Sequence, residues 1–543
     1  MAVRQVVAIV GGAAAVACWG ETPAPPAAEP AVAAGPNVLI VLWDTVRADR
    51  MSLYGATRPT TPKLEAFARD AAVFDRAIAT DMWTLPTHAS MFTGRPPSSI
   101  GATASNRFVA DEHVMLAEHL REAGYDTFAS SANLIASPLT NLMQGFDTLL
   151  TTFRPNGRAQ ETAFQTAAKA ATQAKLLPED RSTEVSPGWR SADPDAGWDK
   201  AVYKDAAPVQ HRALLDWLDA REDPKRPWLA YLNFMEAHTP RIPSDANRRA
   251  LLDDATRTMG LQTDASLFTE VAYMVGKRDY TDGQLEAIRG VYDASLRDLD
   301  DATDALFADL RQRGVLDDTV VILVADHGES LGEHRMMEHR YHVYEQLVHV
   351  PLVVRYPKGV PAGRRSDRVS TMDVFSTVAE LTGVDVGEDP ARRSTSLFGA
   401  RTPQPVFIQM LDPYQSSLKE VKGAWPDLDT SNWERTFRAV YDGSDKLIVD
   451  NHDHAELYDV DADPGETTNR AETEAERVAA LKVLIADWEA GLAAPPKRER
   501  CKAKAGTSQA DQEQLELLGY AEPEEEPCRP VGSGSGRRRP GGR

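Results

Sequence analysis

Three side chains that are able to bind a cation stand directly after runs of apolar residues. Residues 37–43 form one such run, which ends at Asp44, and residues 320–324 form another, which is followed by Asp326 and His327. Runs of this kind predict strands that are buried on both faces of a parallel sheet. Ligands collect at the carboxyl ends of such strands, and two carboxylates that meet there repel each other unless a cation lies between them. The sequence therefore predicts one metal site made by Asp44, Asp326 and His327.

Two further polar groups stand where they could serve that site. Thr84 opens a short helix of small residues that closes at Gly94, and His238 follows an apolar run at residues 228–234. A hydroxyl at a helix N-terminus lies beside backbone N–H groups that favour an anion. The alternatives are an ordinary N-cap for Thr84 and a hydrogen-bonded loop histidine for His238. For Asp326 and His327 the alternative is a surface turn after a strand.

The elements that must position these residues alternate between strand and helix patterns. Strands are predicted at 37–43, 73–78, 127–130, 228–234, 320–324 and 350–356, and helices at 62–71, 116–123, 213–218, 285–313 and 372–381. This alternation predicts an α/β fold, a doubly wound, mostly parallel sheet flanked by helices. Residues 37–395 would form this catalytic domain.

The pattern changes near Pro403. Short strands are predicted at 405–410, 437–441 and 446–449, with a hairpin across Gly443 and Ser444, and a helix at 475–488. This predicts a C-terminal subdomain over 396–495, a small antiparallel sheet covered by a helix. Residues 496–543 are expected to be a largely disordered tail.

The N-terminal residues predict export. Arg4 precedes an apolar stretch that ends in Ala15-Val16-Ala17-Cys18, which is typical of a lipoprotein signal peptide over 1–18, with Cys18 lipidated; an ordinary signal peptide with a chance cysteine is the alternative. A Pro/Ala-rich linker follows at 19–36. We expect a lipid-anchored protein in the bacterial periplasm or on the outer cell surface, which contacts the membrane only through that anchor. Cys501 and Cys528 could pair, and the sequence leaves this open.

The formal charge of −21 argues against a nucleic-acid partner. It does not exclude an anionic substrate, because a bound metal dominates the local field.

Five segments together resemble the sulfatase family of the alkaline phosphatase superfamily. They are PNVLIVLWDTVRAD, TLPTHASMFTG, NFMEAHTP, ADHGESLGEH and ELYDVDADPGETTN, in that order. The resemblance implies an α/β sandwich with a small C-terminal subdomain. It also implies hydrolysis of sulfate or phosphate esters through a metal-bound nucleophile.

By position, the resemblance implies a role for each matching residue. Asp44, Asp326 and His327 match the family's metal ligands, and Thr84 stands where sulfatases place the cysteine that becomes formylglycine. His238 matches a histidine that contacts the ester. His339 matches a lysine or histidine on the substrate's oxygens, with His342 as the competitor.

Four departures from the family pattern shape the expected chemistry. Thr84 cannot become formylglycine, so it would act directly as a metal-bound nucleophile. His88 replaces the family arginine and is expected to touch the anion, and Asn133 falls in a replaced stretch as a weaker candidate for substrate binding. Thr45 replaces a second metal aspartate, which favours manganese or zinc over the calcium that is usual in the family. No second Asp-x-x-x-His set is present, so one metal is expected.

These observations predict an ester hydrolase that acts on small-molecule, glycan or lipid sulfates or phosphates. One alternative is a transferase that passes the same group to an alcohol, and another is a sulfatase-like binding protein without turnover. The retained metal residues argue against the last. The natural substrate stays open, because specificity would lie in loops between residues 162 and 282, where we expect helix and loop without chemistry before residue 197.

Overall fold

The structure is a computed structural model. It describes residues 35–152, 164, 166–168, 170–171, 174–175, 206–399, 404–413 and 416–496. The predicted signal peptide with Cys18, almost all of the linker, and Cys501 and Cys528 lie outside these residues, as do most of 162–197 and all but the first residue of the tail. Among the described residues, no helix combines the length and apolarity needed to span a bilayer.

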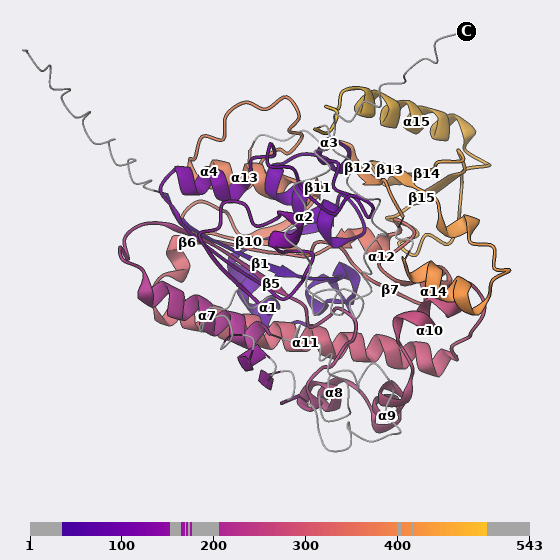
Figure 1. Ribbon diagram of the computed structural model, residues 1–543, viewed down its shortest axis with the longest axis horizontal. Helices are drawn as coiled ribbons and strands as arrows, with labels where there is room; N and C mark the ends of the chain where they lie inside the picture. Colours follow the sequence, from indigo (N-terminus) through magenta and orange to yellow (C-terminus); the bar gives the residue numbers. More distant parts are fainter. Residues whose placement is uncertain are drawn as a thin grey trace, which may run out of the picture.

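A nine-stranded sheet forms the centre of the molecule (Figure 1). Its strand order is β11-β2-β10-β6-β1-β5-β3-β4, with β9 paired to β2. The bounds are β1 Asn37–Trp43, β2 Ala72–Ile78, β3 Asp126–Ser131, β4 Thr148–Thr151, β5 Trp228–Phe234, β6 Thr319–Val324, β9 His349–Val350, β10 Leu352–Arg355 and β11 Gly363–Ser370. Only the pairs that involve β9 or β10 are antiparallel among these described strands. The predicted fold class is confirmed.

Two differences from the predicted strands have simple causes. The single strand predicted at 350–356 is divided into β9 and β10 by Pro351, which has no amide hydrogen for the ladder. The edge strand β11 was missed because it has the sequence GRRSDRVS, whose first six residues are exposed or half-buried. An edge strand of this kind lacks the apolar pattern by which buried strands are found.

Helices cover both faces of the sheet. In Figure 1, α2 (Thr84–Thr93), α4 (Leu116–Glu122) and α13 (Asp373–Thr382) lie on one side of it, and α7 (Ala207–Ala220) and α11 (Asp282–Gln312) lie on the other. The helix α11 begins with a capping box between Thr281 and Gln284. It ends close to Gly314, whose φ of 72° is accessible mainly to glycine.

The smaller helices lie in the connections. They are α1 (Pro62–Phe67), α3 (Pro97–Ile100), α8 (Asp245–Leu251), α9 (Asp254–Gln262), α10 (Leu267–Met274), α12 (Glu345–Val348) and α14 (Ser416–Ala424). A two-stranded ladder, β7 (Ser330–Leu331) with β8 (Met337–Glu338), follows β6. It belongs to the segment that carries His339.

The C-terminal sheet contains β12 (Val406–Met410), β13 (Phe437–Asp442), β14 (Asp445–Asp450) and β15 (Ala455–Asp459), all antiparallel. The helix α15 (Ala475–Ala490) packs against it. The predicted hairpin across Gly443 and Ser444 is present, and Gly443 has a φ of 67°. This sheet with its covering helix agrees with the prediction.

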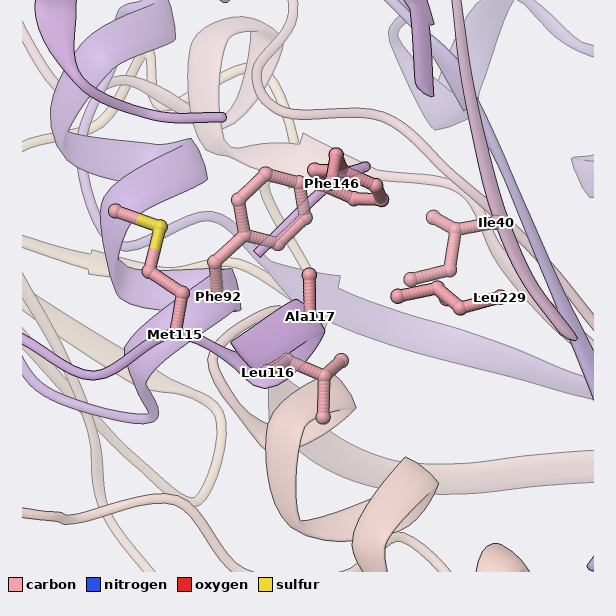
Figure 2. A pocket seen from close by; sticks show the side chains of 7 residues that line it. All are labelled: Ile40, Phe92, Met115, Leu116, Ala117, Phe146 and Leu229. Atoms are coloured by element: carbon pink, nitrogen blue, oxygen red, sulfur yellow. The ribbon is translucent and has the colours of Figure 1, made fainter. Parts of the chain in front are cut away.

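An apolar pocket that is too small to hold a water molecule lies between the sheet and the helices α2 and α4. Figure 2 shows its lining, formed by Ile40, Phe92, Met115, Leu116, Ala117, Phe146 and Leu229. All seven side chains are apolar, so the cavity provides no chemical group and belongs to the core.

Candidate functional site

The sheet register brings the two aspartates together. Leu42 of β1 pairs with Val324 of the parallel strand β6, so continuing the register by two residues places Asp44 opposite Asp326. On the other side of β1, the Asp44 amide donates to the Phe234 carbonyl at 2.9 Å. The ends of β1, β5 and β6 therefore form one edge, and the predicted metal residues meet there.

One ligand atom from each of Asp44, Asp326 and His327 lies within 4.8 Å of the others, and all three side chains are fully buried. The two carboxylates share one arrangement. Asp44 Oδ2 accepts from Asn133 at 2.8 Å and from Asn233 at 3.2 Å, whereas its Oδ1 has no hydrogen-bond partner. The Asp44 carboxylate thus has one oxygen held by hydrogen bonds from the protein and one without a partner.

Asp326 repeats this pattern. Its Oδ1 accepts from the His327 amide at 2.9 Å and from the Thr45 amide at 3.3 Å, and its Oδ2 has no hydrogen-bond partner. Thr45 reaches this position with a φ of 61°, a left-handed conformation. Buried carboxylate oxygens without hydrogen bonds are costly unless a cation binds them, so these residues fit a metal ion.

Burial also changes the ionisation of the site. Burial, followed by the charge of Asp326, raises the pKa of Asp44 to about 7. Burial likewise raises the pKa of Asp326 to about 7. At pH 7 a substantial fraction of each carboxyl group therefore stays protonated, and binding of a cation would favour the ionised forms.

The His327 ring is oriented by its own backbone. Its Nδ1 donates to the Gly328 carbonyl at 3.0 Å, which leaves Nε2 as the unprotonated nitrogen of the neutral ring. Nε2 lies 3.3 Å from Asp326 Oδ2. Gly328 permits this turn, because a Cβ atom there would lie 2.1 Å from the Gln346 carbonyl oxygen. The unprotonated Nε2 thus faces the carboxylate of Asp326 and is available to bind a cation there.

Thr84 lies at the same place. It is the first residue of α2, whose N-cap is Trp83, so the alternative that Thr84 is the N-cap does not describe this helix. Its Oγ1 lies 3.5 Å from His327 Nε2 and accepts from Asn133 Nδ2 at 3.3 Å. The Thr84 side chain is fully buried. The hydroxyl therefore faces the metal residues.

His88 lies one turn further along α2. Its Nδ1 donates to the Thr84 carbonyl at 2.8 Å, and its Nε2 accepts from the Tyr231 hydroxyl at 2.7 Å. Both ring nitrogens thus contact the protein, and the ring supports the turn that carries Thr84. These contacts do not favour the expected contact between His88 and the anion of the substrate. That contact stays a prediction.

The other two predicted histidines also lie at the site. The His339 ring centroid is 4.6 Å from that of His327 and 5.1 Å from that of His238. The His238 Nδ1 donates to the Thr239 carbonyl at 2.7 Å. His342 instead stacks on Tyr344 with the ring centroids 3.6 Å apart. Of the two competing histidines, His339 is the one that the structure places beside the metal residues.

Asn133 lies closer to the centre than the sequence indicated. It was a candidate for substrate binding, but its amide joins Asp44 to Thr84. The sequence analysis missed its counterpart Asn233, although an asparagine inside the apolar strand WLAYLNF was a usable signal. It also missed the carboxylate of Glu329, which accepts from His339 Nδ1 at 3.0 Å and from Arg241 at 2.6 Å.

Comparison with known proteins identifies the family. The model of the Sulfatase family matches residues 36–384, and a model described as N-sulphoglucosamine sulphohydrolase, C-terminal, matches residues 332–486. A choline-sulfatase of Rhizobium meliloti (strain 1021) is 24% identical over 454 residues, which cover 80% of this chain and 82% of that protein. A multifunctional alkaline phosphatase superfamily protein of Trinickia caryophylli, PehA, is 25% identical over 399 residues, covering 65% of this chain and 74% of that protein.

Solved structures show the same fold. The phosphonate monoester hydrolase of Agrobacterium radiobacter superposes with a TM-score of 0.59 at 21% identity, covering 84% of this chain and 96% of that chain. The first family model alone spans more than half of the sequence. The chain therefore belongs to the sulfatase family of ester hydrolases.

Proposed function

We propose that this protein hydrolyses phosphoric or sulfuric esters through Thr84 as a direct nucleophile, with a divalent cation at Asp44, Asp326 and His327. One observation carries the proposal: the Thr84 hydroxyl, at the first residue of α2, faces a pair of buried carboxylates and the Nε2 atom of His327. Manganese or zinc suits a donor set with one imidazole and few carboxylates.

The cation supplies charge that lowers the pKa of the Thr84 hydroxyl and withdraws electrons from the ester. The residues of the chain supply the orientation. Asn133 links Thr84 to Asp44, and His88 fixes the carbonyl of Thr84 itself. The N-terminus of the ten-residue helix α2 favours the anionic group of the ester.

The reaction has two balanced steps. Thr84 Oγ gives up its proton to solvent and forms a bond to phosphorus or sulfur, while the bond to the leaving oxygen breaks and that oxygen takes up a proton. His238, whose ring lies beside that of His339, is the candidate to supply that proton. Water then attacks phosphorus or sulfur and the bond to Thr84 Oγ breaks, which releases the phosphate, phosphonate or sulfate, while a proton from that water restores the hydroxyl.

Threonine favours phosphorus over sulfur as the reacting atom. A formylglycine nucleophile is a hydrated aldehyde, and its second hydroxyl can expel the anion by breaking a carbon–oxygen bond. The Thr84 Cβ carries only one oxygen, so its ester must be resolved by attack of water at phosphorus or sulfur. The resemblance adds that relatives which use threonine or serine directly often act on phosphate esters. Phosphate and phosphonate esters are thus the first substrates to test, and one solved relative is titled a phosphonate monoester hydrolase.

The experiment compares p-nitrophenyl phosphate, bis(p-nitrophenyl) phosphate, p-nitrophenyl phenylphosphonate and p-nitrophenyl sulfate, each with added manganese or zinc. We expect turnover of at least one phosphorus ester. Thr84→Ala should lower kcat by about 10³-fold or more, because no other hydroxyl replaces the nucleophile.

Thr84→Ser is the matched control, since it keeps the hydroxyl and should retain measurable turnover. Rapid quenching of the wild-type reaction should trap phosphate on Thr84, detected by mass spectrometry. Equal activity of Thr84→Ala and the wild type would rule out this nucleophile. If the wild type hydrolyses none of these esters with either metal, the result would instead favour a binding protein.

A further inference from the structure

A chain of three buried side chains lies beside the metal residues. Arg241 Nη2 donates to Glu329 Oε2 at 2.6 Å, and Glu329 Oε1 accepts from His339 Nδ1 at 3.0 Å. None of the three residues is more than 7% exposed. The His339 ring in turn contacts the rings of His327 and His238. One oxygen of Glu329 thus binds the arginine, and the other holds the histidine.

The position of Glu329 is fixed by its surroundings. Its amide donates to the Gln346 carbonyl at 3.0 Å, and its carbonyl accepts from Arg47 Nη1 at 3.1 Å. Arg241 is anchored as well, because its Nε donates to the Ala237 carbonyl at 3.0 Å. The three side chains therefore join the loop that follows β5 to the segment that follows β8.

The backbone around His339 has an unusual conformation. Glu338, directly before it, has a φ of 63°, and Tyr341, two residues after it, has a φ of 68°. Residues other than glycine rarely adopt these left-handed values, which persist where the surrounding structure imposes them. Both residues are buried. Backbone strain of this kind is typical of segments that place a functional side chain.

The contact with Glu329 decides which nitrogen of His339 carries the hydrogen. A carboxylate only accepts, so Nδ1 is protonated and Nε2 of the neutral ring is an acceptor. An acceptor does not suit the anionic oxygens of an ester. The donors present in the reaction are the Thr84 hydroxyl, which lies beside His327 and Asn133, and the water that attacks in the second step.

We propose that Glu329 and Arg241 are positioning residues for His339, whose Nε2 accepts a hydrogen bond from the water that attacks the esterified Thr84. This role differs from the contact with the substrate's oxygens that the family resemblance implies. The inference rests on the proposed function for the identity of the intermediate. The orientation of the His339 ring does not depend on it.

The variant Glu329→Gln tests this orientation in the full chain. Arg241 has donors only, so the new amide would turn its oxygen toward Arg241 and its NH₂ group toward His339. His339 Nδ1 would then have to accept, and the hydrogen would move to Nε2. We expect ¹⁵N NMR of histidine-labelled, Zn²⁺-loaded protein to show Nδ1–H in the wild type and Nε2–H in the variant. Loss of the signal in His339→Gln assigns it.

Rapid quenching of the reaction with a phosphorus ester measures how fast esterified Thr84 forms and decays. We expect Glu329→Gln to slow the decay by about 10²-fold or more and to leave the formation nearly unchanged. Because Glu329 acts through His339, Glu329→Gln/His339→Gln should be no slower than His339→Gln alone. Glu456→Gln, which alters the carboxylate 3.5 Å from His342, is the matched control and should behave as the wild type does.

Three results would overturn the inference: an Nε2–H tautomer in the wild type, equal decay in the wild type and Glu329→Gln, or additive losses in the double variant. If Glu329→Gln fails to fold, the wild-type tautomer and the decay in His339→Gln decide in the same way. Absence of esterified Thr84 in the wild type would instead mark the failure of the proposed nucleophile. The tautomers then still test the positioning, which an Nδ1–H signal in both proteins would overturn.

Discussion

At the level of single residues, the carboxyl groups of Asp44 and Asp326 lie close together in a buried site, where the ionisation of both has a high free-energy cost. Each has one oxygen held by amides and the other without a hydrogen bond. The pKa of each is raised to about 7, first by burial. Protons and a cation therefore compete for the same oxygens.

This competition predicts that cation affinity depends on pH. The folded-state pKa values lie above those of the unfolded chain, so without a cation these groups favour folding least above pH 7, where both are ionised. A bound cation removes that penalty. We expect Mn²⁺ affinity to rise from pH 5.5 to about 7 by roughly tenfold per pH unit for each proton displaced, and to level off above that. Titration calorimetry in buffers of different ionisation enthalpy measures both quantities.

The control for this prediction is Asp326→Asn, which removes one of the two titrating groups. The Mn²⁺ affinity of this variant should be lower than that of the wild type. Mn²⁺ binding should also displace about one proton fewer. An affinity of the wild type that is unchanged between pH 5.5 and 8 would contradict the assignment of these carboxylates as ligands.

At the level of elements, the helix α2 carries Thr84 at one end and core side chains along its length. Phe92 packs on Tyr231 with the ring centroids 5.2 Å apart, and Tyr231 contacts His88. Phe92 also lines the small apolar pocket between the sheet and α4 (Figure 2). The position of the Thr84 hydroxyl thus depends on packing behind it.

This arrangement predicts a large effect of Phe92→Ala. The substitution would open a cavity where the buried Phe92 ring now packs, so we expect a loss of about 3–5 kcal/mol in the free energy of unfolding. Urea denaturation measures it. Val483→Ala, on the exposed face of α15, is the control and should change stability by less than about 0.5 kcal/mol. A loss under about 1 kcal/mol for Phe92→Ala would mean that α2 is not held by this packing.

At the level of the whole molecule, a buried lysine joins the C-terminal sheet to the catalytic body. Lys446 of β14 is fully buried, and its ammonium lies 3.1 Å from Glu345 and 2.8 Å from Glu466. Glu345 begins α12, a few residues after His339, and its amide donates to Glu466. The C-terminal subdomain therefore supports the segment that carries His339.

We predict that Lys446→Met destabilises the protein by about 3–5 kcal/mol, because it leaves two buried carboxylates without their cation. Adding Glu345→Gln and Glu466→Gln should restore much of this loss. Lys482→Met, which breaks a surface ion pair with Asp453, is the control and should cost less than about 1 kcal/mol. These values come from urea denaturation. A Lys446→Met variant as stable as the wild type would show that the two units do not depend on this contact.

The sequence by itself determined the fold class, most buried strands and three residues at one sheet edge. It could do so because β1 and β6 are continuous apolar runs, and parallel strands bring their carboxyl ends to the same edge. Candidate metal ligands that directly follow such strands can be recognised from the local sequence, without knowledge of the rest of the chain. The resemblance to sulfatases, which the family match confirms, implied roles for Thr84 and His238 and added His339.

Only the tertiary structure decided which polar groups share a buried space. It chose His339 over His342, placed Asn133 and Asn233 on Asp44, and gathered Glu270 with Glu338. None of these pairings has a local signal, because the partners come from separate elements whose contacts depend on strand order and helix packing. Local patterns report burial and periodicity, whereas the balance of charge in a buried site depends on every element that reaches it.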